Sequence, residues 1–363
     1  MIERADLKAA VGAGILSEAQ AVSVLAIADK RRGARENLAP EDEPFELFRG
    51  FNEIFIVIGL SILATGWIAF VTLNVASQIS NITASALLYG CLGGVILWAL
   101  SEYFIRVRRM VAPAIALSVL FAANATIASV IYLSQPFMVA QSDYGSLPLP
   151  LTVALVILAV FWWRFRVPFA LAIIAVGLFA LAIIQASTSQ GAPENLTDLF
   201  LLSAAGQFAW ITLALGALVF VGAMLFDMSD PHRVTRRSAN GFWLHLVAAP
   251  ALVNTVALSL LESETSGSDL LLLAILLGFG VTAIIIDRRS FLIAGIGYVV
   301  VIASTVMDGS GTPYIILLLG IALLSLGAFW ERIRGVMIGY LPERITRRLP
   351  PSSGALELSK EPL

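Results

Sequence analysis

Lysine and arginine are confined to alternate gaps between apolar segments, and this constrains the fold more than any other feature of the chain. All 23 of them can be placed on one side of a membrane if the chain is divided into ten hydrophobic helices. Short loops rich in Lys and Arg remain cytoplasmic. The pattern therefore predicts an all-α, polytopic integral membrane protein with ten transmembrane helices and both termini in the cytoplasm.

The composition agrees with that fold. The chain is 58% hydrophobic and 13% charged, whereas roughly 25% of residues are charged in soluble domains. Crossing about 30 Å of hydrocarbon takes roughly 20 apolar residues, so ten spans would occupy more than half of the 363 residues. Little sequence is left for a separate catalytic domain.

Polar turns bound the expected spans. Two of these turns, Arg164–Arg166 and Asp287–Ser290, are so short that the helices on either side should be antiparallel neighbours. Tryptophans at span ends near the basic turns, such as Trp162 and Trp330, are typical of an interfacial aromatic belt. We place the spans at Asn52–Val71, Thr83–Leu100, Met110–Leu133, Leu147–Trp163, Val167–Ile184, Leu199–Phe226, Gly241–Leu261, Leu270–Ile286, Phe291–Met307 and Pro313–Phe329.

Three regions follow from this division: a cytoplasmic helical hairpin and linker over 1–44, the transmembrane domain over 45–335, and a cytoplasmic tail over 336–363 that we expect to be disordered. In the hairpin, Gly12 and Gly14 would end a first helix. Ser17 and Gln20 would open a second one through a capping box. Two short helices bury little surface, so residues 1–35 are expected to dock on the membrane domain, in a homo-oligomer or on a protein partner.

Glycines recur inside several expected spans, including Gly90, Gly93, Gly94, Gly216 and Gly222. Small residues let membrane helices approach closely. We therefore expect tight helix packing at these positions.

Buried polar residues are the best guide to a site, because they are costly in hydrocarbon and usually face an interior. The chain has few of them within its spans: Asn124, Gln207, His245 and Asn254 are the candidates for lining a cavity. No expected span has Asp or Glu at its centre. This argues against a coupled transporter that uses a midplane carboxylate.

Carboxylates also recur at the cytoplasmic ends of the expected spans, next to arginines. An acid at a helix C-terminus opposes the helix dipole and so needs a cationic neighbour. We expect a cytoplasmic ring of salt bridges, which would act either as an inner gate or as simple helix-end pairing. Its members are Glu53, Glu102, Asp227, Asp287 and Glu331.

Signals for catalysis or cofactor binding are weak. Asp227, Asp230, His232 and His245 carry suitable oxygen and nitrogen ligands, but their spacing matches no metal motif, and we expect no metal or cofactor. Nucleophile elbows, phosphate-binding loops and paired catalytic carboxylates are missing from the sequence. The basic clusters could bind acidic phospholipids, although the topology requires them in any case, and nothing else favours nucleic acid.

The stretches FELFRGFNEIFIVIGL and SDPHRVTRRSANGFWLHLVAAPALVN resemble a family of bacterial predicted membrane proteins described as a domain of unknown function, with a short helical N-terminus before many spans. The resemblance covers residues 5–335. It implies a multi-pass protein of the bacterial inner membrane. No activity, substrate or cofactor follows from it.

Short loops leave the membrane interior as the main place for a site, so the leading functional hypothesis is transport or permeation of a small or amphiphilic solute. Two alternatives stay open. One is a structural or regulatory protein that binds a partner through its N-terminal hairpin. The other is a membrane-embedded lipid enzyme that uses the region from Asp227 to His245 at the level of the headgroups.

Overall fold

The structure is a computed structural model of the full chain. It describes residues 9–17, 20, 51–76, 82–135, 138–141, 143–193, 195–202, 206–230, 236–263, 267–289, 292, 295–296, 298, 312–346 and 348–349. Every regular element in these ranges is a helix. The all-α fold class is therefore confirmed.

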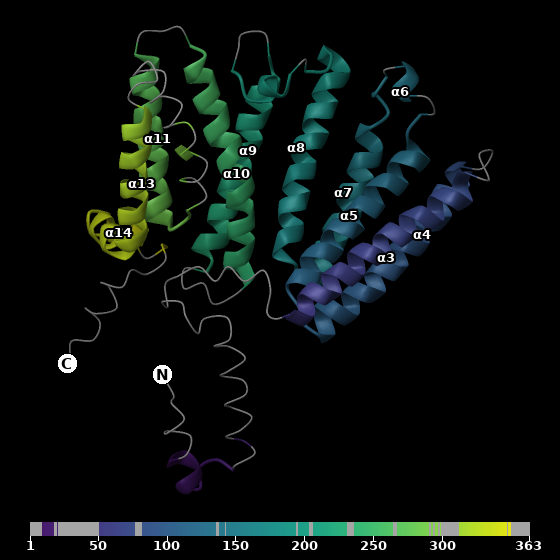
Figure 1. Cartoon of the computed structure of the whole chain (residues 1–363), viewed down its shortest axis with the longest axis horizontal. Helices are drawn as coiled ribbons and strands as arrows, with labels where there is room; N and C mark the ends of the chain where they lie inside the picture. Colours follow the sequence, from purple (N-terminus) through teal and green to yellow (C-terminus); the bar gives the residue numbers. More distant parts are fainter. Residues whose placement is uncertain are drawn as a thin grey trace.

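Seven helices are long and apolar enough to cross a membrane. They are α3 (Phe51–Ala76), α4 (Ile82–Ser101), α5 (Ala112–Leu133), α7 (Pro148–Phe165), α8 (Pro168–Gln190), α9 (Phe208–Met228) and α10 (Arg236–Leu261). They form one bundle (Figure 1), in which α5 packs against both α4 and α7, and α10 packs against both α8 and α9. The first seven expected spans each correspond to one of them.

Further helices complete the chain. α11 (Ser268–Ile286) and α13 (Thr312–Ala328) lie where the eighth and tenth spans were expected, and α13 is bent by 77° from the following α14 (Trp330–Gly339). The expected ninth span, 291–307, lies almost wholly outside the described residues. Short elements are the π-helix η2 (Glu102–Val107), α6 (Met138–Gln141), the 3-10 helix η3 (Leu196–Leu199) and α15 (Glu343–Thr346).

Basic residues gather at one end of this bundle. The lower end of the bundle in Figure 1 contains α14, the C-terminal ends of α4, α7, α9 and α11, and the N-terminal ends of α5, α8 and α10. Every described arginine among residues 51–349 belongs to these ends or to the segments that adjoin them. The helix arrangement thus segregates charge as the sequence pattern requires.

The turn between α7 and α8 shows how the sequence reverses the chain. Arg166 ends α7 in the left-handed conformation with φ 53°, and its guanidinium lies 5.0 Å from the ring centre of Trp162. Val167 is extended, as the residue before a proline prefers, and Pro168 begins α8 at a position where its missing N–H costs nothing. The expected antiparallel neighbours are confirmed, since α7 and α8 pack together.

The expected start of the sixth span at Leu199 is wrong. A capping box between Asn195 and Asp198 opens η3 instead, and η3 ends at Leu199. The chain beyond it is tied to α10, because Ser259 Oγ accepts a hydrogen bond from the N–H of Leu202 at 2.8 Å. The spanning helix α9 begins only at Phe208.

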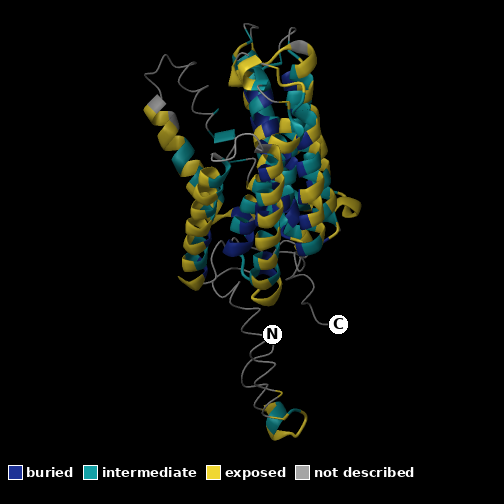
Figure 2. Ribbon diagram, turned by 90° about the vertical axis from the view of Figure 1, so that its right-hand side faces the viewer, coloured by how far each residue is buried: buried dark blue, intermediate teal, exposed yellow. Residues whose placement is uncertain are grey.

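Buried residues line the inner faces of the bundle, and exposed apolar side chains cover its outside (Figure 2). One core cluster joins α5 and α7, where Phe121 and Phe161 stack with ring centres 4.6 Å apart. A second joins α10 and α11 around Val253 and Leu272. The apolar exterior is what a helix bundle in lipid presents, because lipid there replaces water as the solvent.

Close helix approach is confirmed at some of the glycines. A Cβ on Gly90 would come within 2.5 Å of Ala128 Cβ, so α4 and α5 meet there, and Gly216 lets α9 approach Ala251 of α10. Gly222, in contrast, has nothing within 4 Å of its Cβ position. Only some of these glycines therefore lie at a close contact between two helices.

Only a small part of the expected N-terminal hairpin falls within the described residues. The capping box is confirmed there: Ser17 N–H donates to Gln20 Oε1 at 3.0 Å, and Gln20 N–H donates to Ser17 Oγ at 3.2 Å. Gly14 takes the left-handed conformation with φ 71°, as expected at a helix end. The tail beyond residue 349 lies outside the described residues.

Candidate functional site: a membrane groove and a buried ion pair

A groove of about 550 Å³ lies between α3, α4 and α5. It forms because α4 and α5 pack closely at Gly90 while α3 has few buried residues. Apolar side chains make up most of its lining, and the described lining includes no charged residue. The polar members are Trp67, Thr72, Tyr89 and Asn124.

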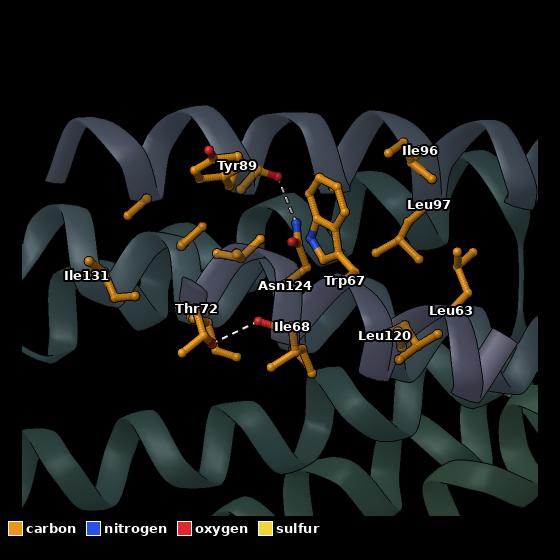
Figure 3. A pocket seen from close by; sticks show the side chains of 18 of the residues that line it. Leu63, Trp67, Ile68, Thr72, Tyr89, Ile96, Leu97, Leu120, Asn124 and Ile131 are labelled. Atoms are coloured by element: carbon orange, nitrogen blue, oxygen red, sulfur yellow. Dashed lines mark hydrogen bonds between the residues drawn. The ribbon is translucent and has the colours of Figure 1, made fainter. Parts of the chain in front are cut away.

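Asn124 projects into this groove from the middle of α5 (Figure 3). Its Nδ2 donates a hydrogen bond to the carbonyl oxygen of Gly90 at 2.9 Å and so ties α5 to α4. Its Oδ1 lies on the Gly93 side, where a Cβ on that glycine would come within 2.7 Å. One end of the amide is therefore structural, and the other faces the groove.

Trp67 brings a hydrogen-bond donor to the same place from α3. Its Nε1 would lie 3.1 Å from a Cβ on Gly93, and its ring meets Tyr89 edge-on with centres 6.3 Å apart. Figure 3 shows the indole nitrogen beside the Asn124 amide. A donor and an acceptor thus face the groove at one point of an otherwise apolar surface.

A second candidate site lies at the basic end of the bundle, where Asp227 is buried at the end of α9. His245 of α10, with no exposed surface, places its Nε2 2.9 Å from Asp227 Oδ2. Arg288, just after α11, donates from Nε to the same oxygen at 3.0 Å and from Nη2 to Oδ1. Its Nη2 also donates to the carbonyl oxygen of Ser238 at 3.0 Å.

This buried cluster holds three helix ends together through one carboxylate. Arg288 is only 1% exposed, and burial lowers its pKa from its ordinary value to about 9. The guanidinium therefore stays protonated at pH 7 and pairs with Asp227 as an ion. Removing two ions from water costs several kcal/mol each, so the hydrogen bonds around the pair are what make its burial tolerable.

Gly241 provides the space for that carboxylate. A Cβ at Gly241 would lie 2.2 Å from Asp227 Oδ1 and 3.3 Å from the carbonyl oxygen of Ala223. No side chain other than hydrogen fits at this point of α10. The glycine thus matters for the position of Asp227 and not only for helix packing.

A neighbouring contact fastens α14 to the same end. Trp330 Nε1 donates to Asp287 Oδ1 at 2.7 Å, and the guanidinium of Arg289 lies 5.0 Å from the tryptophan ring centre. Arg334 of α14 is completely buried. Through Arg288, the turn after α11 therefore contacts α9 and α10. Through Asp287 and Arg289, the same turn contacts α14.

The expected cytoplasmic carboxylates have different partners. Glu53 is buried and accepts hydrogen bonds from the N–H groups of Val111 and Ala112, so it caps α5. Glu102 pairs with Arg106 at 3.1 Å and with Arg164 at 2.8 Å. Asp227 belongs to the buried cluster described above, Asp287 accepts the hydrogen bond from Trp330, and the side chain of Glu331 lies outside the described residues. Each of the four described carboxylates thus joins its own helix end to another helix.

The four expected cavity residues are not brought together. Of the four, Asn124 alone lines the groove. Gln207 is the exposed residue that precedes α9, because that helix starts later than expected. His245 pairs with Asp227, and Asn254 Oδ1 accepts a hydrogen bond from the hydroxyl of Tyr298 at 3.0 Å.

Sequence reasoning missed Trp67, Gly93, Arg288 and Trp330 as site residues. Trp67 reads as one more apolar residue of a span, and Arg288 as one more cytoplasmic arginine. The short turn that carries Arg288 directly after Asp287 was the available signal, since it leaves the side chain near the ends of neighbouring helices. His232, a possible metal ligand in the sequence, lies outside the described residues.

Comparison of the chain with protein-family models, with curated protein sequences and with solved structures gives no match. The functional argument therefore depends on the geometry of the groove and of the buried cluster. The structure supports directly a helical protein with seven helices long and apolar enough to cross a membrane among its described residues.

Proposed function

We propose that the protein carries a small, uncharged or amphiphilic solute across or within the membrane, and that the solute occupies the groove between α3, α4 and α5. The observation that supports this is the groove itself, about 550 Å³ in volume with no charged residue in its described lining. Ligand sites commonly have volumes of about 300–1,000 Å³ and are mostly apolar with a few polar groups.

The packing of α3 supports movement of the solute as well as binding. Glu53 pins the inner end of α3 to α5, and Leu60 is its only buried apolar residue among those described. The rest of the helix contacts its neighbours loosely along the groove. We propose that α3 pivots near Glu53 and so opens the groove towards the opposite side of the membrane.

The second half of the bundle would remain fixed during this movement. Asp227, Arg288 and His245 connect α9, α10 and the end of α11 through buried hydrogen bonds. Breaking such a buried pair costs about 3–5 kcal/mol. We therefore assign the moving part to α3 and the static part to α9–α11.

The membrane arrangement in this proposal is ten spans with both termini in the cytoplasm of a bacterium and the basic end facing the cytoplasm. The seven long helices and the one-sided distribution of arginine support it. The positive-inside rule accounts for the orientation, and the bacterial inner membrane is proposed from the family resemblance of the sequence.

Reconstituted vesicles test the proposal directly. Proteoliposomes containing a trace of an NBD-labelled, uncharged glycolipid are treated with dithionite, which reduces only the label in the outer leaflet. A functional protein should let nearly all of the label be reduced, whereas protein-free vesicles should retain about half of it. A rate equal to that of protein-free vesicles would contradict the transport proposal for this class of amphiphile.

A matched pair of variants connects the rate to the groove. Ala64 lines it, and Ala64→Phe should fill it and slow label loss at least tenfold. Ile62 is 67% exposed on α3 and is not part of the lining. Ile62→Phe therefore places the same phenyl ring outside the groove and should leave the rate of label loss unchanged. Equal rates in both variants would place the route elsewhere.

A further inference from the structure

We infer that Trp67, Asn124 and Gly93 form a subsite for the hydroxyl group of an uncharged, long-chain lipid. The inference deepens the proposed function, because it takes the groove as the place where the solute binds. It assigns the chemical class of the solute from the polar atoms that the groove presents.

Gly93 lets the two polar atoms of this subsite come close to each other. A Cβ at its position would lie 2.7 Å from Asn124 Oδ1 and 3.1 Å from Trp67 Nε1. Both polar atoms therefore lie against the bare backbone of α4, near enough to each other for one oxygen atom in the groove to bond to both. The neighbouring Gly94 differs, since its Cβ position has only Asn124 Nδ2 nearby, at 3.6 Å.

Both atoms have capacity for another hydrogen bond. Asn124 uses Nδ2 for the carbonyl oxygen of Gly90, and within the described part of the chain its Oδ1 and Trp67 Nε1 have no hydrogen-bond partner. Asn124 lies midway along α5, where water is scarce and polar groups without a partner are costly. A ligand that supplied both partners would remove that cost.

A hydroxyl group matches this pair of atoms. Its O–H can donate to Asn124 Oδ1 while the same oxygen accepts from Trp67 Nε1. A carbonyl or ether oxygen can only accept, and a hydrocarbon can do neither. An ionised amine or carboxylate would meet no opposite charge among the described lining residues.

The rest of the groove suits a hydrocarbon chain. Its lining on α3 runs from Leu60 to Val75, which is about 22 Å at a rise of 1.5 Å per residue. Trp67 stands near the middle of this length. The ligand would therefore place its hydroxyl at the subsite and its chain along α3 towards one end of the groove.

Equilibrium binding of tritiated dodecanol tests this assignment. The full-length protein is placed in lipid nanodiscs, and binding to protein-free nanodiscs is subtracted. Dodecanol should bind saturably, and dodecyl methyl ether and dodecane should compete at least tenfold less well. If dodecane competes as well as dodecanol, the groove is a general apolar surface and the hydroxyl subsite is refuted.

Three variants separate the subsite from the fold. Gly93→Ala should weaken dodecanol binding about tenfold, because its methyl group would displace Asn124 Oδ1 and Trp67 Nε1. Gly94→Ala adds the same methyl group one residue further along α4 and should bind normally. Trp67→Phe keeps an aromatic ring and removes the donor, so it should lower the preference for dodecanol over the ether even if Gly93→Ala folds poorly. Unchanged binding in both Gly93→Ala and Trp67→Phe would overturn the inference.

The outcomes for the two proposals are distinguishable. Saturable, hydroxyl-dependent binding without glycolipid movement would refute transport and retain the subsite. Movement of glycolipid with no preference for dodecanol over dodecane would retain transport and refute the subsite.

Discussion

Asp227 and Arg288 should be strongly coupled in their effect on stability. Arg288 has 1% of its surface exposed, and its guanidinium makes two hydrogen bonds to the Asp227 carboxylate. Replacing one partner alone leaves an uncompensated buried charge, which costs about 3–5 kcal/mol. We expect Asp227→Leu and Arg288→Met each to lower the free energy of unfolding by that amount.

The double variant should be far less harmful than the sum of its parts. Burial lowers the pKa of Arg288 to about 9, because removing the guanidinium from water disfavours its charged form. Replacing both ions by apolar groups is therefore close to neutral, apart from the loss of the His245 partner, which costs about 1–3 kcal/mol. Additive effects would instead total about 6–10 kcal/mol.

Unfolding by SDS in mixed micelles, followed by far-ultraviolet circular dichroism, measures all three variants on one scale. Gly241→Ala gives an independent route to the same pair, because its methyl group would displace the Asp227 carboxylate. Gly222→Ala, in open space on α9, is the matched control and should have little effect. Additive single costs, or single costs below about 1 kcal/mol, would refute the reasoning on buried charge.

Two further effects follow from the contacts at the basic end. Glu53→Ala removes the acceptor for the first backbone N–H groups of α5 and should lower the free energy of unfolding by about 1–2 kcal/mol. Glu53→Gln keeps an acceptor oxygen and should recover part of that stability in thermal unfolding of the purified protein. Equal losses of stability in both variants would argue against capping. Trp330→Phe keeps an aromatic ring beside Arg289 but loses the hydrogen-bond donor to Asp287. Amide hydrogen exchange in α14 should therefore become faster, while α10 stays protected. Unchanged exchange in α14 would show that this hydrogen bond does not hold the helix in place.

The helices were predictable because each is a long apolar run, and in lipid a backbone without internal hydrogen bonds is too costly. The limits of α5 and α7 agree with their prolines near the first turn. The start of α9 was missed because the apolar residues before it look like more helix, whereas the Asn195 cap starts a separate turn. The local sequence pattern thus predicts that a helix is present better than it predicts where the helix begins and ends.

The site was less predictable, because its contacts join residues that are distant in sequence. Asp227 and Arg288 are 61 positions apart, and nothing in the sequence indicates that they pair with each other. Asn124 could be selected as a polar residue within a span. Trp67 could not, since its donor becomes significant only when α3 places it beside Gly93.

The separation of Asp227 from Arg288 also has a consequence for biogenesis. A chain inserted from its N-terminus completes α9 and the α10 residue His245 before the ribosome has made Arg288, 61 residues after the carboxylate. Until α11 enters the membrane, the α9–α10 hairpin holds an acidic group whose guanidinium partner does not yet exist. The last third of the chain therefore supplies the cation that neutralises a buried acid of the middle third. A nascent chain truncated before residue 288 should be a substrate for membrane quality control.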